Sequence, residues 1–551
     1  MEPTMTERTT PPAILILVAV AALTLMACGQ TDATAPPAQR AQPTPATGPL
    51  TAEQLRLTPP TWHGYLQAMR KADMIADPLE RCLAFPDLPG TQWPEGHAAA
   101  HCVAHFAPGI TKEEIEVLVG KSDFEGLGQR MRVLDEMHAK TKSSEGIHAA
   151  FGLLLESADI ERIVSKWRKQ APGDLYAEML RAEWLASQAG AARGQDTASK
   201  TPPAAFARMR QLLDDARVSY ARVLAGASPD SALRLQALIL AQNVAMLDGD
   251  RNAGDDAFRK AQAMAPDCES LASVRMNMLQ PRWGGSYQEM EAYAKTLEPM
   301  VRDTPQLQHL VVEPLVHRAE MLRCRASGCT GLPADNGQII SLLRRAIDQA
   351  SDEEAMHALA HMHRNGKVNG DYHESLIMEA QAERFRAESD SALFVASMLP
   401  EDSAWRAQYV ERGLASATDK VSARRTAGEL YFQLGQPEEA ERHLVACLEL
   451  PKSDACLAGL AWGWLSTQSL APAERSARAK PWLDRALSAT PNDPSLLLFR
   501  VMQAAYAGDD NGEQDALARF DALPQANSAG NIQRRATIVK VIDQSLGRPP
   551  Q

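Results

Sequence analysis

Apolar residues recur at every third or fourth position along most of this chain, the spacing that gathers them on one side of an α-helix. The stretch 206–225 is a clear example. Its apolar stripe consists of Met209, Leu212, Leu213, Ala216 and Tyr220. Aromatic residues make up only 5% of the chain, which suits closely packed helices better than β-sandwiches. The pattern therefore predicts an all-α fold.

The stretch 279–294 interrupts the helical pattern and specifies a turn. A proline and a glycine pair end one helix, because glycine accepts the left-handed conformation of a helix exit. A serine then caps the next helix, and Glu289 three residues later completes a capping box. A tryptophan is the large apolar group that could fix the bend. The residues of this structural turn are Pro281, Trp283, Gly284, Gly285 and Ser286.

This turn could be a structural hinge or a contact site for a partner. Glycine and capping requirements already explain most of its residues, which favours the hinge. In either case it joins two helices in a hairpin and says nothing about chemistry.

A large residue, a small residue and a proline recur at fixed offsets. One copy is Phe258-x-x-Ala261-x4-Pro266, and 483–491 repeats the same offsets. The large residue fills the groove of a neighbouring hairpin, the small one lets backbones approach, and proline ends the second helix. We therefore expect helical hairpins that stack in sequence.

The stretch 421–451 resembles a tetratricopeptide repeat. The residues at the offsets of that repeat are Gly428, Tyr431, Gly435, Ala440 and Leu444. Further upstream, Ser351 with Glu354 predicts a capped helix, and the turn after it, 365–371, resembles that of a Sel1-type repeat. Stacked hairpins of this kind form a solenoid with one concave surface, and such surfaces usually bind peptides or protein domains.

The turn at 281–286, with Met290 and Ala294 after it, resembles the hallmark of domain-of-unknown-function family 4034. The resemblance covers about 124–298. The upstream features that agree in order are Trp167 with Pro172, Trp184, Ala192-Arg193-Gly194 and the 257–266 helix. Because the family has no assigned reaction, the resemblance implies a helical-repeat fold and no catalytic residue.

The N-terminus reads as a processing signal. Its apolar run, 13–27, is shorter than the roughly 20 residues of a spanning helix. It ends in Leu25-Met26-Ala27-Cys28, which resembles the bacterial lipobox. The resemblance implies that Cys28 is diacylated and, with Gly29-Gln30 after it, anchored at the periplasmic face of the outer membrane. The alternative is a plain signal peptide with an incidental cysteine.

The sequence thus predicts a tetratricopeptide-like solenoid behind a lipoprotein signal and a disordered linker that contains five prolines. The expected parts are the signal peptide (1–28), a Pro/Ala/Thr-rich linker (29–55), an N-terminal helical cap (56–123), the family-4034-like domain (124–298), a Sel1-like region (299–415), and tetratricopeptide-like repeats with a C-terminal cap (416–551).

Cysteine spacing suggests disulfides, which an oxidising periplasm would permit. Cys82 and Cys102 flank a Pro/Gly-rich loop, and Cys324 and Cys329 flank a short one. Both pairs are disulfide candidates, and the alternative is that the cysteines remain unpaired. Two further cysteines, at 447 and 456, could be paired or remain buried thiols.

Histidines at i, i+4 and i+8 place His97, His101 and His105 on one helical face, and histidines so spaced can chelate a metal such as zinc. No carboxylate on that helix completes a ligand set, so a polar surface face is the competing interpretation. The second cluster, His357, His361 and His363, has only its first two members on one side.

The net charge is −12, which argues against a nucleic-acid-binding protein. No phosphate-binding glycine loop, metalloprotease motif or nucleophile elbow occurs, so we expect no catalysis and no cofactor. The first hypothesis is a lipid-anchored scaffold that binds unknown envelope proteins on its concave surface. The alternatives are a metal-binding or sensing lipoprotein that uses His97, His101 and His105, or an enzyme with an unrecognised site.

Overall fold

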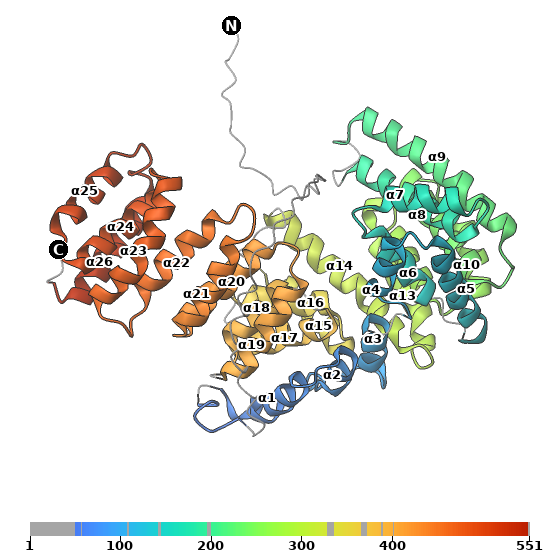
Figure 1. The fold of residues 1–551 in the computed structure, drawn as a ribbon. Helices are drawn as coiled ribbons and strands as arrows, with labels where there is room; N and C mark the ends of the chain where they lie inside the picture. Colours follow the sequence, from blue (N-terminus) through green and yellow to red (C-terminus); the bar gives the residue numbers. More distant parts are fainter. Residues whose placement is uncertain are drawn as a thin grey trace, which may run out of the picture. The chain divides into compact units, whose positions relative to one another are not determined.

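The computed structural model describes residues 50–56, 58–106, 109–141, 145–194, 200–327, 336–364, 372–386, 389–400 and 402–548. This part of the chain forms 26 α-helices and three short 3-10 helices, and it contains no strand (Figure 1). The predicted all-α, helical-hairpin fold is confirmed. Among the helices of the described ranges, none combines the length and the apolarity that a membrane span requires.

The described chain divides into two compact units. Unit 1 comprises residues 103–314, and unit 2 comprises residues 50–102 together with 315–548. The boundaries fall within α3 (His97–Phe106) and α14 (Gln308–Ser327). The cap expected over 56–123 is therefore shared, because its first part packs with unit 2 and its last part with unit 1.

Unit 1 is a bundle arranged around one buried helix, α10 (Ala232–Asp248), which contacts α5, α6, α8, α9, α11 and α12. Ser231 caps its start by accepting a hydrogen bond from the backbone N–H of Arg234, and Gly249 ends it with a φ of +78°. The other helices of the unit are α4 (Lys112–Gly120), α5 (Phe124–Thr141), α6 (Glu145–Leu155), α7 (Ile160–Gln170), α8 (Leu175–Arg193), α9 (Pro203–Gly226), α11 (Arg251–Met264), α12 (Glu269–Met278), η1 (Pro281–Trp283), α13 (Tyr287–Leu297), η2 (Glu298–Met300) and η3 (Pro305–Leu307).

Unit 2 begins with α1 (Pro60–Asp73) and α2 (Pro78–Ala84) and continues, after a gap of more than 200 residues, with stacked hairpins. These hairpins contain α15 (Gly337–Gln349), α16 (Glu353–Arg364), α17 (Tyr372–Phe385), α18 (Ser389–Met398), α19 (Ser403–Ser416), α20 (Lys420–Gln433), α21 (Pro437–Leu448), α22 (Asp454–Ser466), α23 (Pro472–Ala489), α24 (Pro494–Ala507), α25 (Asp510–Asp521) and α26 (Ala529–Leu546).

A buried ionic cluster joins α1 to the hairpins of unit 2. The carboxylate of Asp73 accepts hydrogen bonds from Trp405 Nε1 at 2.7 Å, from the Tyr409 hydroxyl at 2.9 Å and from Arg412 at 2.9 Å. Arg412 also lies 3.5 Å from the buried carboxylate of Glu383 on α17. Because a buried charge is tolerated only when it is paired and hydrogen-bonded, this cluster specifies where α1 docks.

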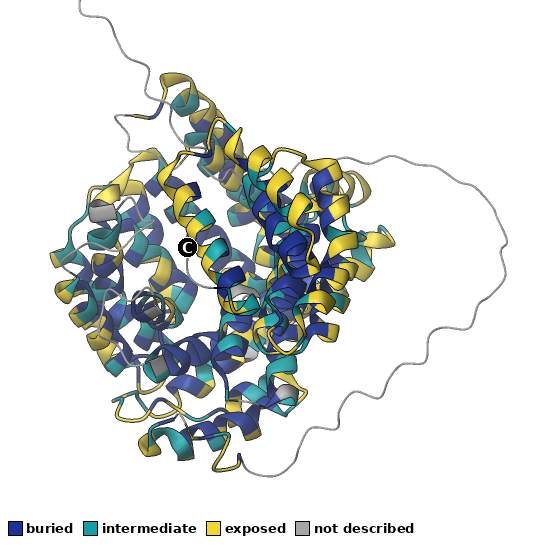
Figure 2. Ribbon diagram, turned by 90° about the vertical axis from the view of Figure 1, so that its left-hand side faces the viewer, coloured by how far each residue is buried: buried dark blue, intermediate teal, exposed yellow. Residues whose placement is uncertain are grey.

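The helices from α20 to α25 stack as a repeat array in which each helix contacts the next. Helices α20, α22, α24 and α26 also contact one another in turn. Small residues make this close packing possible. A Cβ atom on Gly428 would overlap the Leu444 side chain, and one on Gly463 would overlap the Phe432 ring. Gly435 makes the turn between α20 and α21 with a φ of +69°. Figure 2 shows the result, with buried residues on the helix sides that face neighbours and exposed ones on the outer sides.

Candidate functional site

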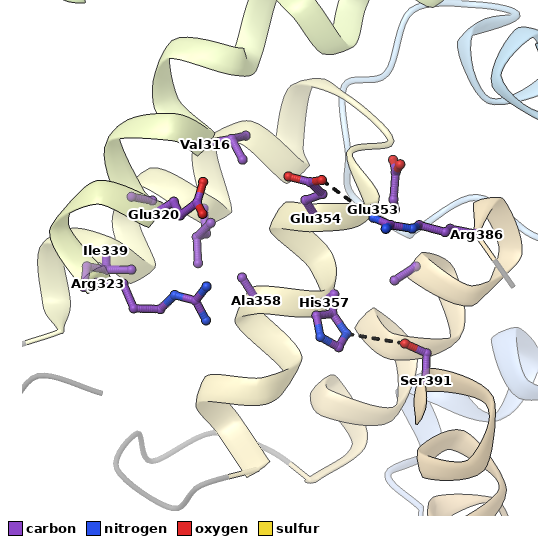
Figure 3. A pocket seen from close by; sticks show the side chains of 13 residues that line it. Val316, Glu320, Arg323, Ile339, Glu353, Glu354, His357, Ala358, Arg386 and Ser391 are labelled. Carbon is purple, nitrogen blue, oxygen red and sulfur yellow. Dashed lines mark hydrogen bonds and ion pairs between the residues drawn. The ribbon is translucent and has the colours of Figure 1, made fainter. Parts of the chain in front are cut away.

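A cavity of about 270 Å³ opens among helices α14 to α18, all within the part of unit 2 that follows residue 314 (Figure 3). It combines charged side chains of both signs with an apolar wall. Its lining consists of Val316, Ala319, Glu320, Arg323, Ile339, Leu343, Glu353, Glu354, His357, Ala358, Ala382, Arg386 and Ser391.

The start of α16 is set by Asp352, whose carboxylate accepts a hydrogen bond from the backbone N–H of Ala355 at 2.7 Å. The predicted capping by Ser351 is wrong, because the Ser351 hydroxyl bonds to histidines of α3 instead. Burial, reinforced by the neighbouring Glu353, raises the pKa of Asp352 to about 7. The cap places the first turns of α16 along the cavity.

The charged side chains of the cavity come from facing helices. Glu320 and Arg323 stand one turn apart on α14, so they share a face of that helix. On the other side, Arg386 lies 3.6 Å from Glu354, and both side chains are about half exposed or more, at 49% and 66%. That separation exceeds the roughly 2.7–2.9 Å of a charge-assisted hydrogen bond, and exposure weakens it further. The contact between Arg386 and Glu354 is therefore a weak ion pair.

His357 is held at the edge of the cavity by two buried partners. Its Nδ1 atom lies 2.8 Å from a carboxylate oxygen of Glu379 and 3.4 Å from the Ser391 hydroxyl. A serine nucleophile would need the ring nitrogen that does not face the carboxylate. Because serine and glutamate meet the same nitrogen, this trio lacks the geometry of a catalytic triad and instead orients the imidazole.

The apolar wall is formed by α14 and α15. Val316, Ile339 and Leu343 are buried, and Ala319, Ala358 and Ala382 lie beside them in the lining. An apolar wall beside a few fixed polar groups is the usual composition of a small-molecule site.

A second candidate surface lies on the C-terminal repeats. Trp462 of α22 is 37% exposed, and its ring stacks on that of Phe499 of α24 at a centroid distance of 5.1 Å. The two residues belong to the first helices of consecutive hairpins. A shallow groove of about 830 Å³ also runs along α23, α24 and α25. In that groove Asp484 already pairs with Lys480, at 2.7 Å, and with Arg500.

In the first histidine cluster, His97 and His101 take part in packing within unit 2. His97 is buried, and its Nε2 atom lies 2.9 Å from the Ser351 amide nitrogen. His101 lies 2.9 Å from the Ser351 hydroxyl and stacks on Phe385 at 4.2 Å. His105 is exposed. The expectation of a polar surface face therefore fails for His97.

Within the described ranges, no three His, Cys, Asp or Glu side chains are placed to hold a metal ion. In the second histidine cluster, the His357 and His361 rings lie 6.4 Å apart, and His363 is buried beside Glu374 at 3.6 Å. The turn 365–371 that resembles a Sel1-type repeat lies outside the described residues.

Two disulfides join pairs of described residues in unit 2. One joins Cys82 to Cys102, the pair that flanks the Pro/Gly-rich loop, with an S–S distance of 2.00 Å. The other joins Cys447 to Cys456. Cys329, the expected partner of Cys324, lies outside the described residues, as does the lipidation candidate Cys28.

The turn after α12 has the expected geometry. Gly284 has a φ of +86°, and a Cβ atom on Gly285 would overlap the Leu279 backbone. Ser286 caps α13 by accepting a hydrogen bond from the Glu289 amide at 3.2 Å. Trp283 is half-buried, and the guanidinium groups of Arg193 and Arg282 lie 5.0 Å and 5.1 Å from its ring centroid. The Ala192-Arg193-Gly194 stretch and the turn at 281–286, which both carry the resemblance to family 4034, are therefore in contact.

Sequence reasoning missed the α14–α18 cavity. Its residues come from the neighbourhood of five helices, so no single stretch of the sequence contains the site. Of its polar residues, we considered Glu354 as a capping residue and His357 as a possible metal ligand.

Neither a protein-family model nor a curated protein matches the chain. Among solved structures, a protective antigen of uropathogenic Escherichia coli strains that displays an SLR fold is 10% identical, covering 75% of this chain and 94% of its own, with a TM-score of 0.29. Yeast Tom70 is 10% identical, covering 79% of this chain and 95% of its own, with a TM-score of 0.28.

Proposed function

We propose that this protein is a lipid-anchored scaffold of the bacterial envelope that binds another protein on its C-terminal repeats and catalyses no reaction. The observation that carries the proposal is the stack of the exposed Trp462 on Phe499, which lies on the array of hairpins. Large exposed aromatic groups are costly in water, and tryptophan is enriched among the residues that dominate interface energies.

The arrangement of this aromatic pair favours a role in contact over a role in packing. Trp464, two residues along the same helix, is fully buried and packs against Phe432 at 5.5 Å. Trp462 therefore lies on the other side of α22, away from the core that Trp464 completes. Its side chain has a flat, largely apolar face available to a partner.

The matched test compares two exposed apolar positions of unit 2. Trp462 and Val445 are each 37% exposed, but Val445 lies on a second helix, α21. We expect Trp462→Ala to abolish co-purification of a partner from the native envelope and Val445→Ala to leave it unchanged. Equal recovery with both variants, or no partner with the wild-type chain, would reject the proposal.

The anchor is proposed from Leu25-Met26-Ala27-Cys28, which resembles the lipobox. Two or more acyl chains hold a protein stably on a membrane, whereas a single chain does so only marginally. Cys28→Ser should therefore release the chain into the soluble periplasmic fraction. Retention of the variant in the outer membrane would contradict the proposal that Cys28 carries the lipid anchor. It would not bear on the proposal that the repeats bind a partner.

The resemblance of 124–298 to family 4034 belongs to the same proposal. It is supported by the contact of Arg193 with Trp283, which brings the Ala-Arg-Gly stretch onto the Pro-Arg-Trp-Gly-Gly-Ser turn. In this view the central part supplies no catalytic group.

A further inference from the structure

A basic side chain, Arg534 of α26, lies beside the aromatic stack on the C-terminal repeats. We propose, on the basis of the function proposed above, that the partner binds through an acidic segment in which a carboxylate and a large apolar side chain are two residues apart. The apolar side chain covers Trp462 and Phe499, and the carboxylate pairs with Arg534.

Three neighbouring helices bring these groups together. Helices α22, α24 and α26 contact one another in turn (Figure 1). The ring of Trp462 on α22 stacks on that of Phe499 on α24 at 5.1 Å. Arg534 donates a hydrogen bond to the hydroxyl of Ser495, also on α24, at 3.2 Å. Ser495 and Phe499 are one helical turn apart, about 6 Å along the axis, and share a face of α24. The guanidinium group therefore lies next to the stack.

The fold does not balance the charge of Arg534. Its side chain is exposed, and its hydrogen bond to Ser495 goes to a neutral hydroxyl group. Among the residues that the structure describes, no carboxylate lies within 4.0 Å of its guanidinium nitrogens. The next residue, Arg535, pairs with Asp521 at 3.4 Å. A carboxylate from a partner would give Arg534 the charge-assisted hydrogen bond that Arg535 already has.

The other charged groups of this surface are engaged with their own neighbours. On α20, Arg425 and Glu429 pair with each other at 3.1 Å. At the start of α24, the Asp493 carboxylate caps the helix by accepting a hydrogen bond from the Leu496 amide at 2.9 Å. A basic group of a partner would be repelled by Arg534. The charges therefore favour an acidic segment over a basic one.

The distance between the two contacts fits an extended segment. Every second side chain of an extended chain points to the same side, and two such side chains are about 6.6 Å apart. This spacing matches the helical turn between Ser495, which Arg534 contacts, and Phe499. A carboxylate directly next to the apolar residue would point to the opposite side. We therefore expect one residue between them.

The binding test uses the purified full-length chain and biotinylated octapeptides with serine and glycine at their ends, measured by biolayer interferometry at low salt. The acidic probes contain Phe-Ser-Asp or, in the reverse direction, Asp-Ser-Phe at their centre. Matched probes carry asparagine or lysine in place of aspartate. We expect the tighter acidic probe to bind at least about threefold better than its asparagine match, the size of effect of an exposed ion pair, and the lysine probe to bind least. Equal binding of the aspartate and asparagine probes, or no binding of either acidic probe, would overturn the proposal.

Charge variants at two adjacent positions locate the contact. Arg534→Gln should remove the preference for aspartate over asparagine. Arg535→Gln changes the net charge by the same amount and should keep that preference, because Arg535 pairs with Asp521. Arg534→Glu should reverse the preference, so that the lysine probe binds more tightly than the aspartate probe, a gain that misfolding does not produce. A preference that survives Arg534→Gln, or that is lost equally in Arg535→Gln, would overturn the assignment.

Failure of this proposal differs from failure of the proposed function. If Trp462→Ala abolishes recovery of the partner while Arg534→Gln changes neither recovery nor the order of the probes, the repeats bind a partner but not through an acidic segment. If the wild-type chain recovers no partner, the proposed function is rejected and this proposal with it.

Discussion

Asp73 on α1 and Arg412 on α19 are 339 residues apart in the sequence, yet they form a buried ion pair at 2.9 Å. The pair links the first helix of the described chain to the middle of unit 2. The Asp73 side chain is 0% exposed and also accepts from Trp405 and Tyr409, so its charge is fully compensated. The N-terminal helices are therefore part of the unit that carries both candidate surfaces.

The first prediction concerns this ion pair. Removing one partner of a buried pair leaves an uncompensated charge, which typically costs about 3–5 kcal/mol. We expect Asp73→Asn to lower the free energy of unfolding of unit 2 by about that amount, measured by denaturant titration. Glu53→Gln, which breaks an exposed pair with Arg56, is the control and should change little. Similar small effects of both substitutions would mean that the cluster does not hold α1 in place.

The second prediction concerns pH. Burial raises the pKa of Glu383 from 4.5 to about 7, although Arg412 acts in the opposite direction. The folded chain therefore holds this proton more tightly than the unfolded chain does. The stabilisation that the folded chain gains from protonated Glu383 is fully present below about pH 4.5 and is lost as the pH rises through about 7.

Other groups also make the stability depend on pH, because burial raises the pKa of Asp352 to about 7 and lowers that of His443 to about 4. The effect of Glu383 is therefore measured as the difference in stability between the wild-type chain and a variant without this carboxyl group. We expect the stability difference between the wild-type chain and Glu383→Gln to change by about 3 kcal/mol between pH 4 and pH 8, at roughly 1.36 kcal/mol for each pKa unit. A difference that stays constant over this range would show that Glu383 does not titrate there.

The third prediction concerns the disulfide between Cys82 and Cys102, which encloses a loop with a sequence separation of 20 residues. Closing a loop of this length stabilises the folded state by about 3 kcal/mol, chiefly by restricting the unfolded chain. Replacing both cysteines by alanine should lower the stability of unit 2 by about that amount in thermal or denaturant unfolding. An unchanged midpoint would show that the bridge adds nothing to the ionic docking of α1.

The fourth prediction tests the close packing of the repeats. Gly463 lies where a Cβ atom would overlap the Phe432 ring, whereas Gly530 in α26 faces open space. Gly463→Ala should destabilise unit 2 by about 1–3 kcal/mol through overpacking. Gly530→Ala should be neutral or stabilising by up to about 1 kcal/mol, because alanine favours a helix. If both variants have the same stability, the α20–α22 packing described above is incorrect.

Much of the repeat architecture was predictable because it depends on local signals. Gly435 needs a positive φ at a turn, and Ser286 caps α13 through a residue three positions away, so short stretches are enough to identify both. Helical periodicity likewise predicted the all-α fold. These features involve contacts within one or two turns of the chain.

The cavity and the docking of α1 were not predictable for the opposite reason. Ser351 was expected to cap α16, but it bonds to His97, a residue 254 positions away. Local preference alone could not reveal this competing partner, and Asp352 takes over the cap. In the same way, Asp73 and Glu383 are ordinary helix acids until the fold brings Arg412 between them.

The scaffold proposal is tested most directly by photo-crosslinking in cells. A photoreactive phenylalanine analogue is placed at position 462 or, as the exposure-matched control, at position 445. We predict one discrete protein adduct from position 462 and none from position 445. The absence of an adduct at 462, or the same adducts from both positions, would contradict the proposal that the Trp462–Phe499 surface binds a partner.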